Sequence, residues 1–472
     1  MSEAASTHVT LAKSTRNSTT HDRTREGALL PSLAPLLHAW LPRQRWFAGK
    51  GRPVTGFSLV SATEMLPLDG AAGPGLLHLL VRAHQPPHAE HPADDCYQLL
   101  LGARTSLPPL LGGALLGRVE QGPLAGRAVY DALHDPRLAD LLLERFRRPG
   151  SLGSLRFERT AAIPAGLPPR VLDAEQSNSS IVYGDAYILK IFRRVFPGTN
   201  PDLELPLALG REGCGRVPAP VAWFEAPGPQ PLTLGVLQPF LRDALDGWRL
   251  ALGALGEGRD FLPEARALGR TTAEVHTALA AALPAPALRG AQTRQLVARM
   301  TQRLEAASEA VPALVPYVPG LRAAFEAVTD LGHRGGWAQQ RVHGDLHLGQ
   351  ALRSADGFWS LIDFEGEPAR PLSERRRPSP PVRDVAGMLR SFDYAARSHH
   401  PWDPRWAARC RDAYCEGYAQ ASGSDPRGEP ELLRAHETDK AVYEVLYEAR
   451  HRPDWLPVPM AAIQRLAGPA AA

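Results

Sequence analysis

The spacing of hydrophobic residues predicts a strand-rich first half and a helix-rich second half. Short apolar runs bounded by Gly, Pro and polar residues are typical of strands, whereas from Asp243 onward Ala, Leu and Arg recur at helical spacing. The expected strands are 57–62, 76–83, 97–101, 156–162, 171–176, a hairpin over 181–192, 217–224 and 232–240. The expected helices begin at residues 29 and 201 and include 135–148, 247–255, 263–281 and 291–307. This pattern predicts an α/β (α+β) protein.

Changes in composition divide these elements into domains. Residues 1–26 are rich in Ser, Thr and charge and are expected to form a disordered tail. We expect a small β-rich N-terminal domain over 27–106, a sheet-based lobe over 107–238 and a mostly helical lobe over 239–472. Residues 371–381, rich in Pro, Arg and Ser, are expected to form an irregular loop.

Composition and cysteine usage exclude several classes of protein. Of the 472 residues, 44% are hydrophobic and 22% charged, as in a globular protein with an ample core. A net charge of +3 gives no basis for a nucleic-acid partner. The four cysteines lack Cys-x-x-Cys spacing and are typical of reduced thiols. No apolar run approaches the ~18 residues of a membrane span, and residues 1–26 lack the core of a signal peptide. We expect a cytoplasmic protein.

Three polar residues in 341–365 are spaced for phosphoryl transfer. Asp345 and Gln350 are five residues apart, and Asp363 follows Asp345 by eighteen. A short turn between the apolar runs 350–353 and 358–362 predicts a β-hairpin that returns Asp363 to the side of Asp345. No lysine lies nearby in the sequence, so we expect cations to occupy the site.

This arrangement supplies the groups that a phosphoryl-transfer reaction needs. Asp345 would orient a substrate hydroxyl and accept its proton, while Asp363 and Gln350 would hold Mg²⁺. Taken singly, each residue also fits an ordinary turn, a helix cap or a strand end. The combined spacing favours the catalytic interpretation.

A second stretch has the pattern of a nucleotide-binding hairpin. The polar turn 177–180 (Ser-Asn-Ser-Ser) precedes a hairpin that ends in Lys190. Asn178, Ser179 and Ser180, with backbone N–H groups, would donate hydrogen bonds to phosphates. A lysine at a strand end is also commonly solvated. Its expected carboxylate partner is Glu204, on the helix beginning at residue 201.

Further residues on this part of the chain have weaker signals. Asp202 precedes Glu204 by two positions, and its simpler explanation is a carboxylate favoured by the helix dipole. The strand 232–240 ends Gln-Pro-Phe, and the backbone of Gln238 and Phe240 would contact the adenine edge as a connector between lobes. Asp384 would be an N-cap, and His276 a satisfied core or surface histidine.

The last long helix carries a broad face that suits a sugar. Lys440, Tyr443, Glu444 and Tyr447 recur at helical spacing, and Arg450 follows them. Aromatic rings with flanking charges can bracket the hydroxyls of a disaccharide. A surface helix with i,i+4 ion pairs explains the same pattern equally well.

Several of these segments resemble one known family. Residues 343–350 (His-Gly-Asp-Leu-His-Leu-Gly-Gln), 363–368 (Asp-Phe-Glu-Gly-Glu-Pro) and 383–394 (Arg-Asp-Val-Ala-Gly-Met-Leu-Arg-Ser-Phe-Asp-Tyr) resemble the aminoglycoside-phosphotransferase-like kinases, and within them the maltokinases. Most kinases carry Asn at the position of Gln350, but the maltokinase branch has Gln. The basic-aromatic segment 42–52 resembles the start of the maltokinase cap domain. By itself it would either bind an anion or pack Trp46 and Phe47.

The resemblance implies a two-lobed protein-kinase-like fold with an N-terminal cap over 27–106. It implies an enzyme that uses ATP and Mg²⁺ to phosphorylate maltose at the anomeric hydroxyl, giving maltose 1-phosphate for glycogen or α-glucan synthesis. We expect the protein to be a monomer. It assigns phosphate binding to Lys190, bracing of the catalytic loop to Asp384, and catalysis to Asp345. The sugar-binding residues that it suggests are His347, Asp393, Lys440, Tyr443, Glu444, Tyr447 and Arg450.

Two alternatives remain open. The same machinery could phosphorylate an aminoglycoside or another small hydroxylated molecule, but an aminoglycoside pocket should be acidic, and Lys440 and Arg450 oppose that. A pseudokinase that binds sugar or nucleotide without turnover is the other alternative. Such a degenerate domain usually lacks one of the residues that are present here as Lys190, Asp345 and Asp363.

Overall fold

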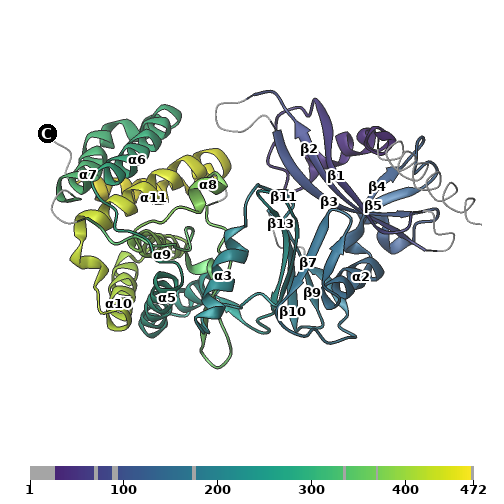
Figure 1. The fold of residues 1–472 in the computed structure, drawn as a ribbon. Helices are drawn as coiled ribbons and strands as arrows, with labels where there is room; N and C mark the ends of the chain where they lie inside the picture. Colours follow the sequence, from purple (N-terminus) through teal and green to yellow (C-terminus); the bar gives the residue numbers. More distant parts are fainter. Residues whose placement is uncertain are drawn as a thin grey trace, which may run out of the picture. The chain divides into compact units, whose positions relative to one another are not determined.

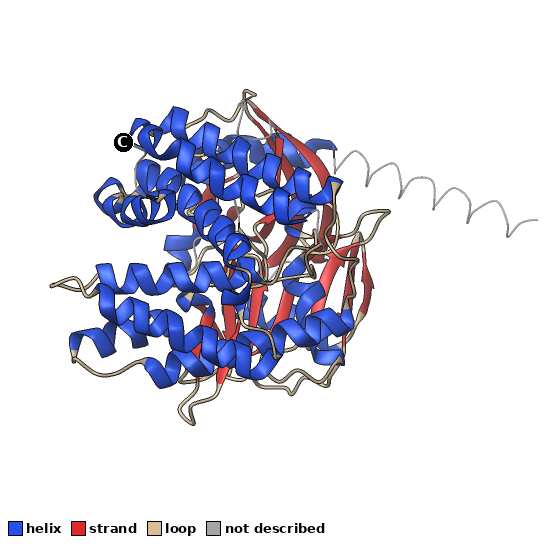
Figure 2. Ribbon diagram, turned by 90° about the vertical axis from the view of Figure 1, so that its left-hand side faces the viewer, coloured by secondary structure: helices blue, strands red, loops and turns tan. Residues whose placement is uncertain are grey.

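Strands fill the first part of the chain and helices the second, as the hydrophobic pattern predicts (Figures 1 and 2). The computed structural model describes residues 27–68, 73–87, 94–172, 177–332, 336–367 and 370–468. Two units make up the chain: a first unit of Met1–Asn200 with Pro220–Phe240, and a second unit of Pro201–Ala219 with Leu241–Ala472. The predicted α/β class is confirmed. The predicted tail 1–26 and residues 173–176 of one predicted strand lie outside the described residues.

The first unit begins with an antiparallel sheet. Its strands follow the order β1 (Gly56–Leu66), β2 (Gly75–His84), β3 (Asp94–Arg104), β5 (Ala128–Asp131) and β4 (Leu115–Arg118), and β11 (Arg194–Val195) pairs with β3. Residues 27–40 are helical, and their apolar side buries Leu33, Leu37 and Trp40 in one cluster with the inward-facing leucines of the sheet. The helix predicted from residue 29 and the first three predicted strands are therefore confirmed.

The basic-aromatic segment 42–52 packs its rings into this unit. Trp46 and Phe47 are buried, and their ring centroids lie 5.9 and 5.2 Å from that of Tyr97 on β3. Of the two interpretations of this segment, packing is the correct one for these two side chains.

A second sheet completes the first unit. Its order is β6 (Gly150–Leu152), β7 (Leu155–Arg159), β12 (Ala222–Ala226), β13 (Leu232–Pro239), β10 (Tyr187–Ile191), β9 (Ser179–Tyr183) and β8 (Pro169–Leu172). Helix α2 (Pro136–Arg147), capped by Asp135, packs Phe146 against Phe157 and Phe224 of this sheet.

The predicted hairpin over 181–192 is confirmed by the β9–β10 pairing. Gly184 and Asp185 at its tip have φ angles of +54° and +53°, as a two-residue type I′ turn requires. The strand predicted over 217–224 is corrected, because β12 begins only at Ala222. Pro218 and Pro220 have no N–H to donate to a neighbouring strand, so the paired strand begins only after these two residues.

The second unit is mainly helical. Its helices are α3 (Pro201–Arg211), α4 (Gly247–Gly256), α5 (Leu262–Ala282), α6 (Ala291–Ala310), α7 (Val318–Gly332), α8 (Leu372–Arg375), α9 (Val382–Arg397), α10 (Pro404–Ser422), α11 (Pro430–His451) and α12 (Pro457–Ala467). A small sheet of β14 (Leu245–Asp246), β15 (Ala351–Arg353) and β16 (Trp359–Leu361) lies among them. The helices predicted over 247–255, 263–281 and 291–307 are confirmed.

Two features of this unit follow directly from residue type. Helices α5 and α10 touch backbone to backbone, because a Cβ on Gly269 would overlap the carbonyl oxygen of Tyr414 and one on Gly417 that of Arg266. The predicted loop 371–381 is corrected, since Leu372–Arg375 forms the short helix α8.

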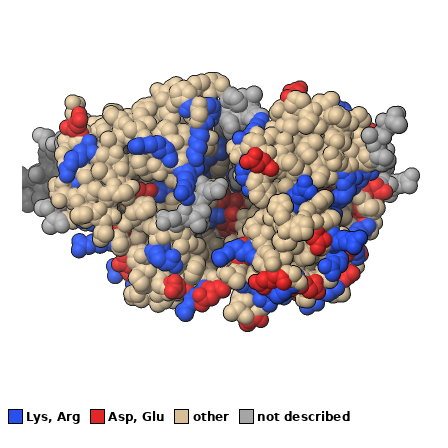
Figure 3. All heavy atoms as spheres, turned by 180° about the vertical axis from the view of Figure 1, so that it is seen from behind, with Lys and Arg blue, Asp and Glu red and all other residues tan. Residues whose placement is uncertain are grey.

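Within the described ranges, no helix is both long and apolar enough to cross a membrane. Basic and acidic side chains are spread over the face of the molecule drawn in Figure 3.

Candidate active site

The β15–β16 hairpin brings Gln350 and Asp363 together. Ala351 pairs with Leu361, and just beyond this pair the Gln350 amide nitrogen Nε2 donates to Asp363 Oδ2 at 2.9 Å. The predicted hairpin is confirmed, and the expected position of Asp363 beside Asp345 stays a prediction. Asp363 has a φ of +65°, a left-handed conformation that is uncommon outside glycine and is often found at functional sites.

Asp384 holds the catalytic loop through the backbone. Its carboxylate accepts the N–H groups of His343 at 2.7 Å and Gly344 at 2.8 Å, and it also contacts Nε2 of His276 at 3.0 Å. Burial works to raise the pKa of Asp384, but these hydrogen bonds and the nearby histidines hold it below its usual value. The bracing role is confirmed. The N-cap interpretation is wrong, because Pro381 is the N-cap of α9 and Asp384 lies within the first turn.

His276 and Gly387 support the same loop from the helices beneath it. His276 is buried, with Nδ1 at 2.9 Å from the Tyr418 hydroxyl, so it is the satisfied core histidine that we expected. Helix α9 approaches so closely that a Cβ at Gly387 would meet the carbonyl oxygen of Leu346. The loop therefore rests on backbone and buried polar groups.

Asp345 is paired with a lysine, contrary to expectation. The Lys440 ammonium nitrogen on α11 lies 2.8 Å from Asp345 Oδ1 and 3.0 Å from Glu367 Oε1. Burial works to lower the pKa of Lys440, but the two carboxylates more than offset it and raise this pKa above its usual value. The sequence neighbourhood of Asp345 gave no sign of this cation, because Lys440 comes from a helix 95 positions away.

Glu367 joins Lys440 to two arginines. It is buried and pairs with Arg370 and, at 3.4 Å, with Arg383. Burial works to raise its pKa, but the three cations hold it well below the usual value. Arg383 also donates to the carbonyl oxygen of Gly344 at 3.0 Å, so this cluster contacts the catalytic loop directly.

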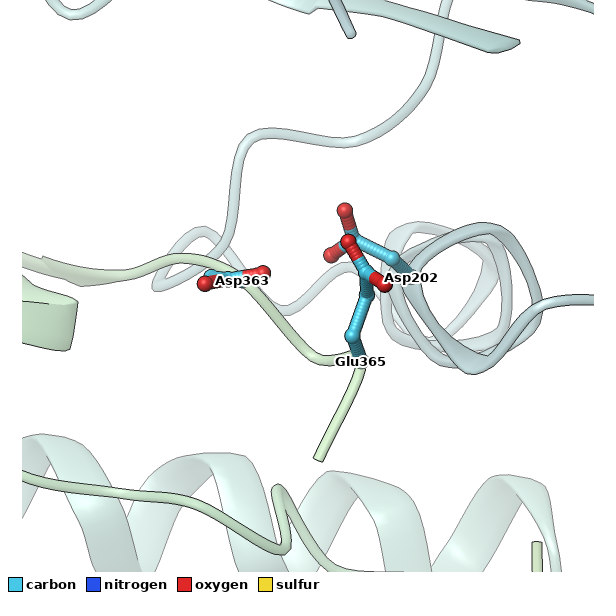
Figure 4. A group of neighbouring side chains, drawn as sticks. All are labelled: Asp202, Asp363 and Glu365. Carbon is cyan, nitrogen blue, oxygen red and sulfur yellow. The ribbon is translucent and has the colours of Figure 1, made fainter. Parts of the chain in front are cut away.

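Three carboxylates converge beside the hairpin. One oxygen each of Asp202, Asp363 and Glu365 lie within 4.8 Å of one another, Asp202 from helix α3 and the others from the loop after β16 (Figure 4). Asp202 is buried, and its Oδ1 accepts the N–H of Phe364 at 2.7 Å. Sequence reasoning preferred Glu204 to Asp202 as the functional acid of this helix and did not single out Glu365. The sequence Asp-Phe-Glu at 363–365 could have indicated Glu365, because it places a second acid two residues after Asp363.

This donor set fits Mg²⁺. Carboxylate oxygens, with the side-chain amide of Gln350 beside them, are the hard ligands that Mg²⁺ prefers. Like charges so close together also favour a cation between them. Asp363, Glu365, Asp202 and Gln350 are the residues that would hold it.

Within the second unit, Glu204 is held by arginines. Its carboxylate pairs with Arg341 at 2.8 Å and Arg376 at 3.6 Å. Its expected role as the carboxylate partner of Lys190 stays a prediction. Asp202, two residues earlier on α3, belongs to the acidic cluster.

The residues of the first unit that were expected to bind nucleotide lie on a regular ladder of paired strands. Lys190 on β10 stands opposite Ser180 on β9 and Val236 on β13. Ser179 and Ser180 are strand residues rather than members of a polar turn, since they pair with Ile191 and Lys190. Asn178 precedes them and is buried.

The expected contact of Gln238 and Phe240 with an adenine edge stays a prediction. Gln238 pairs with Ile188 in the β13–β10 ladder. The backbone N–H of Phe240 donates to the carbonyl oxygen of Ala186 at 2.9 Å. That N–H is therefore already engaged and is not a free donor for an adenine edge.

Two expected sugar-binding acids are held by arginines. Glu444 accepts from Arg390 Nε at 3.0 Å and Nη2 at 2.7 Å. Asp393 accepts from Arg390 at 2.8 Å and Arg465 at 3.0 Å, and Arg411 lies at 3.5 Å. Both acids therefore belong to an ion-pair network, and their direct contact with a sugar stays a prediction.

The remaining expected sugar-binding residues are His347, in the loop that carries Asp345, and Lys440, Tyr443, Tyr447 and Arg450 on α11. Tyr443 and Tyr447 are stacked with ring centroids 6.3 Å apart, and Lys440 lies 5.0 Å from the Tyr443 centroid. His347 accepts the Gly349 N–H through Nδ1 at 3.1 Å, and burial lowers its pKa. Arg450 is exposed near the end of α11.

Comparison with known proteins identifies the family. Residues 170–424, more than half of the chain, match the model of the phosphotransferase enzyme family, and residues 40–135 match the maltokinase N-terminal cap domain. The chain belongs to the phosphotransferase enzyme family. The kinase family and the kinase-like fold predicted from the motifs are confirmed.

Similar proteins include sugar kinases. A glucosamine kinase of Streptacidiphilus jiangxiensis is 32% identical over 322 residues, covering 61% of this chain and 71% of the relative. One of Mycolicibacterium smegmatis (strain ATCC 700084 / mc(2)155) is 30% identical over 320 residues, covering 63% and 79%. A solved structure of glucosamine kinase in complex with glucosamine, ADP and inorganic phosphate covers 92% of this chain and 98% of that one at 25% identity, with a TM-score of 0.64. Cap and phosphotransferase domain together support a sugar kinase.

In this phosphotransferase, a buried arginine ties the cap sheet to the nucleotide hairpin. Arg193 pairs with Asp131 at the end of β5, donates through Nε to Ser179 Oγ at 2.8 Å, and lies 5.0 Å from the Trp46 ring centroid. Gln98 on β3 adds hydrogen bonds to the carbonyl oxygens of Phe192 and Leu234. Sequence reasoning missed Arg193, although it follows Lys190 by only three positions.

Proposed function

We propose that this phosphotransferase transfers the γ-phosphoryl group of ATP to the anomeric hydroxyl of maltose and releases maltose 1-phosphate and ADP. Under this proposal it acts as a cytoplasmic monomer, and the product feeds α-glucan synthesis. The match to a maltokinase cap supports the proposal. The observation that carries it is the position of Lys440, whose ammonium group lies between the carboxylates of Asp345 and Glu367.

Each residue has one task in the proposed reaction. Asp345 orients the sugar hydroxyl and takes its proton as the oxygen forms a bond to the γ-phosphorus and the bond to the ADP oxygen breaks. Lys190 binds the phosphates. Bound Mg²⁺ would neutralise charge on the phosphates, with Asp363 and Gln350 as its first proposed ligands. Asp384 keeps the Asp345 loop in place by accepting the N–H groups of the two preceding residues.

Lys440 favours a neutral acceptor over an amino sugar. An ammonium group on the substrate needs a carboxylate that has no cation of its own. The acids of this ion-pair network each already have a cationic partner: Asp345 and Glu367 pair with Lys440, Asp439 with Arg303, Glu444 with Arg390, and Glu437 with Arg411. A neutral disaccharide meets no such conflict, and the Tyr443–Tyr447 stack offers it an apolar platform.

Glucosamine is the second candidate acceptor, because two relatives, 32% and 30% identical, are named glucosamine kinases. An amino sugar would have to displace the Lys440 ammonium from Asp345 or Glu367. The two candidates therefore predict opposite effects of removing that charge.

One assay separates them. ADP release should be measured with maltose, glucose, glucosamine and trehalose, and the position of the new phosphate should be read by ³¹P and ¹H NMR. We expect the highest kcat/KM for maltose, phosphate at C1, and no reaction with trehalose, whose anomeric oxygens are both in the glycosidic bond. In Lys440→Met, glucosamine should gain relative to maltose. A parent enzyme that prefers glucosamine, or that places phosphate at a primary hydroxyl, would refute the maltose assignment and leave the kinase assignment intact.

A further inference from the structure

Five arginines surround a small cavity next to the Glu367 cluster. Arg299 and Arg303 come from α6, Arg370 and Arg377 flank α8, and Arg383 lies in the first turn of α9. The cavity has a volume of about 50 Å³. Its lining does not include Asp345, Asp363 or Gln350, so it is distinct from the proposed catalytic and metal-binding groups.

Carboxylates neutralise only part of this positive charge. Arg303 pairs with Asp439, and Arg370 pairs with both Asp439 and Glu367. Among the residues that the structure describes, Arg299 and Arg377 form no ion pair. Glu374 also lines the cavity, but it is bonded to neither of them.

The crowding is visible in the properties of Arg299. Burial lowers the pKa of its guanidinium, and the charges of Arg377, Arg303 and Arg370 lower it further, with only the charge of Glu374 acting in the opposite direction. Guanidinium groups that repel one another around a common space are stabilised when an anion enters it.

A buried nitrogen points to the same requirement. Nε2 of His436 is buried without a hydrogen-bond partner among the described residues, and His436 lines the cavity. Burial lowers the pKa of His436 to about 3, so the imidazole is neutral and carries one N–H. A buried polar group left unpaired destabilises the fold, and a hydrogen-bonding group in the cavity would relieve this cost.

We propose that this cavity binds a single tetrahedral oxyanion, either inorganic phosphate or the phosphoryl group of a small metabolite. Unpaired guanidinium forks suit the oxygens of such an anion, and the neutral His436 ring with its unpaired Nε2 lines the same cavity. Pro378 and Pro380 also line the cavity, whose volume of about 50 Å³ suits one small group. The proposal does not depend on the identity of the sugar.

The anion would also act on the catalytic loop. Arg383 lines the cavity, pairs with Glu367 and donates to the Gly344 carbonyl oxygen. An anion that draws Arg370 and Arg383 toward it competes with Glu367, which holds Lys440 beside Asp345. Occupancy should therefore change kcat, which makes the cavity a regulatory site.

Binding can be tested with inorganic phosphate by calorimetry on the full chain, with saturating Mg-ADP present to fill the nucleotide site. Arg299→Ala/Arg377→Ala should weaken phosphate binding by at least tenfold. Arg294→Ala, an exposed residue of the same helix α6, serves as the matched control and should stay within twofold of the parent. Equal affinities in all three proteins, or no binding by the parent, would overturn the proposal.

Thermal unfolding gives an independent readout that a purely structural arginine cluster would not produce. Phosphate should raise the Tm of the parent and of Arg294→Ala but not that of the double variant. Without phosphate, the double variant should be at least as stable as the parent, because like-charge repulsion has been removed. A less stable double variant whose Tm still rises with phosphate would show that these arginines are structural, and the proposal would fail.

Glucose 1-phosphate as a second probe identifies the source of the anion. Binding at least tenfold tighter than that of inorganic phosphate would assign the cavity to the phosphoryl group of a metabolite, whereas weaker binding would assign it to free phosphate. In either case kcat should respond to the anion in the parent and not in the double variant. A kcat that responds equally in both would contradict the regulatory role.

Discussion

The ammonium nitrogen of Lys440 lies 2.8 Å from a carboxylate oxygen of Asp345, and the two residues are 95 positions apart in the chain. A second carboxylate, that of Glu367, holds the same ammonium group at 3.0 Å. The acid proposed to accept the substrate proton is thus oriented by a cation from a distant helix. In protein interiors such charge-assisted bonds fix a side chain more strongly than neutral ones.

Lys440→Met should lower kcat/KM for the sugar by roughly 10²-fold, because it removes a charge-assisted bond of about 1.5–3 kcal/mol that positions Asp345. The KM for ATP should change little. Steady-state kinetics with each substrate varied in turn would measure both. Glu431→Gln, exposed at the start of the same helix, is the control. Equal losses for sugar and ATP would contradict a role confined to the acceptor side.

Asp345→Asn should reduce turnover by on the order of 10²-fold or more, because an amide cannot accept the proton of the hydroxyl. Nucleotide binding should persist, since Asp384 still fixes the loop through the His343 and Gly344 N–H groups. Single-turnover kinetics would test the loss of turnover, and calorimetry with Mg-ADP would test whether nucleotide binding persists. Turnover within tenfold of the parent would remove Asp345 from its proposed role.

Asp363→Ala should abolish Mg²⁺-dependent nucleotide binding, whereas Asp202→Asn should weaken it about tenfold. Asp363 offers a carboxylate to the ion, while Asp202 also anchors the loop that carries Asp363 and Glu365, through the Phe364 N–H. Titration of Mg²⁺ at fixed ADP would rank the two variants. A parent-like Mg²⁺ response in Asp363→Ala would place the metal on other residues.

Arg193→Ala should raise the KM for ATP several-fold and leave the KM for the sugar unchanged. Arg193 links Asp131 of the cap sheet to Ser179 at the start of the nucleotide hairpin, so its loss frees the hairpin rather than the acceptor side. Arg193→Lys should recover part of the effect. Arg137→Ala, exposed on α2, is the control. A rise in both KM values, or in neither, would argue against a positioning role for the cap.

His78→Gln should make stability less dependent on pH. Burial lowers the pKa of His78 to about 4, so between pH 6.5 and 4 the unfolded chain binds a proton that the folded chain does not. Stability is therefore lost as pH falls through this window. The change in unfolding free energy from pH 7 to pH 5 should shrink by about 2 kcal/mol in the variant.

Urea unfolding at the two pH values would measure this difference. Gln at position 78 retains a donor for the Gln98 side-chain oxygen that His78 contacts at 2.9 Å. His134→Gln, at an exposed position, is the control and should behave as the parent does. An unchanged difference in His78→Gln would mean that other groups dominate the acid sensitivity.

Elements made by residues close in sequence were predictable from the chain alone. The β15–β16 hairpin, the Gly184–Asp185 turn and the helix capped by Asp135 each depend on a few neighbouring residues with strong local preferences. The catalytic segment belongs to this class, since a short hairpin suffices to return Asp363 to Gln350. The motifs in this segment were also sufficient to identify the kinase family.

Partners that meet across the fold were not predictable in the same way. Helical spacing correctly grouped Lys440 and Glu444 on one helix, but it gave no information on the helices that pack against them. The structure directs Lys440 to Asp345 and buries Glu444 against Arg390. Likewise, the sequence offered both Asp202 and Glu204 as candidate acids, and only the packing of α3 separates them.

What the sequence determined by itself is the set of reactive groups and the short-range geometry among them, because local backbone preferences fix distances over a few residues. What the tertiary structure decided is which cation neutralises which acid. Glu204 went to Arg341 and Asp345 to Lys440, since a buried charge must find a partner and the available partners depend on how distant helices pack.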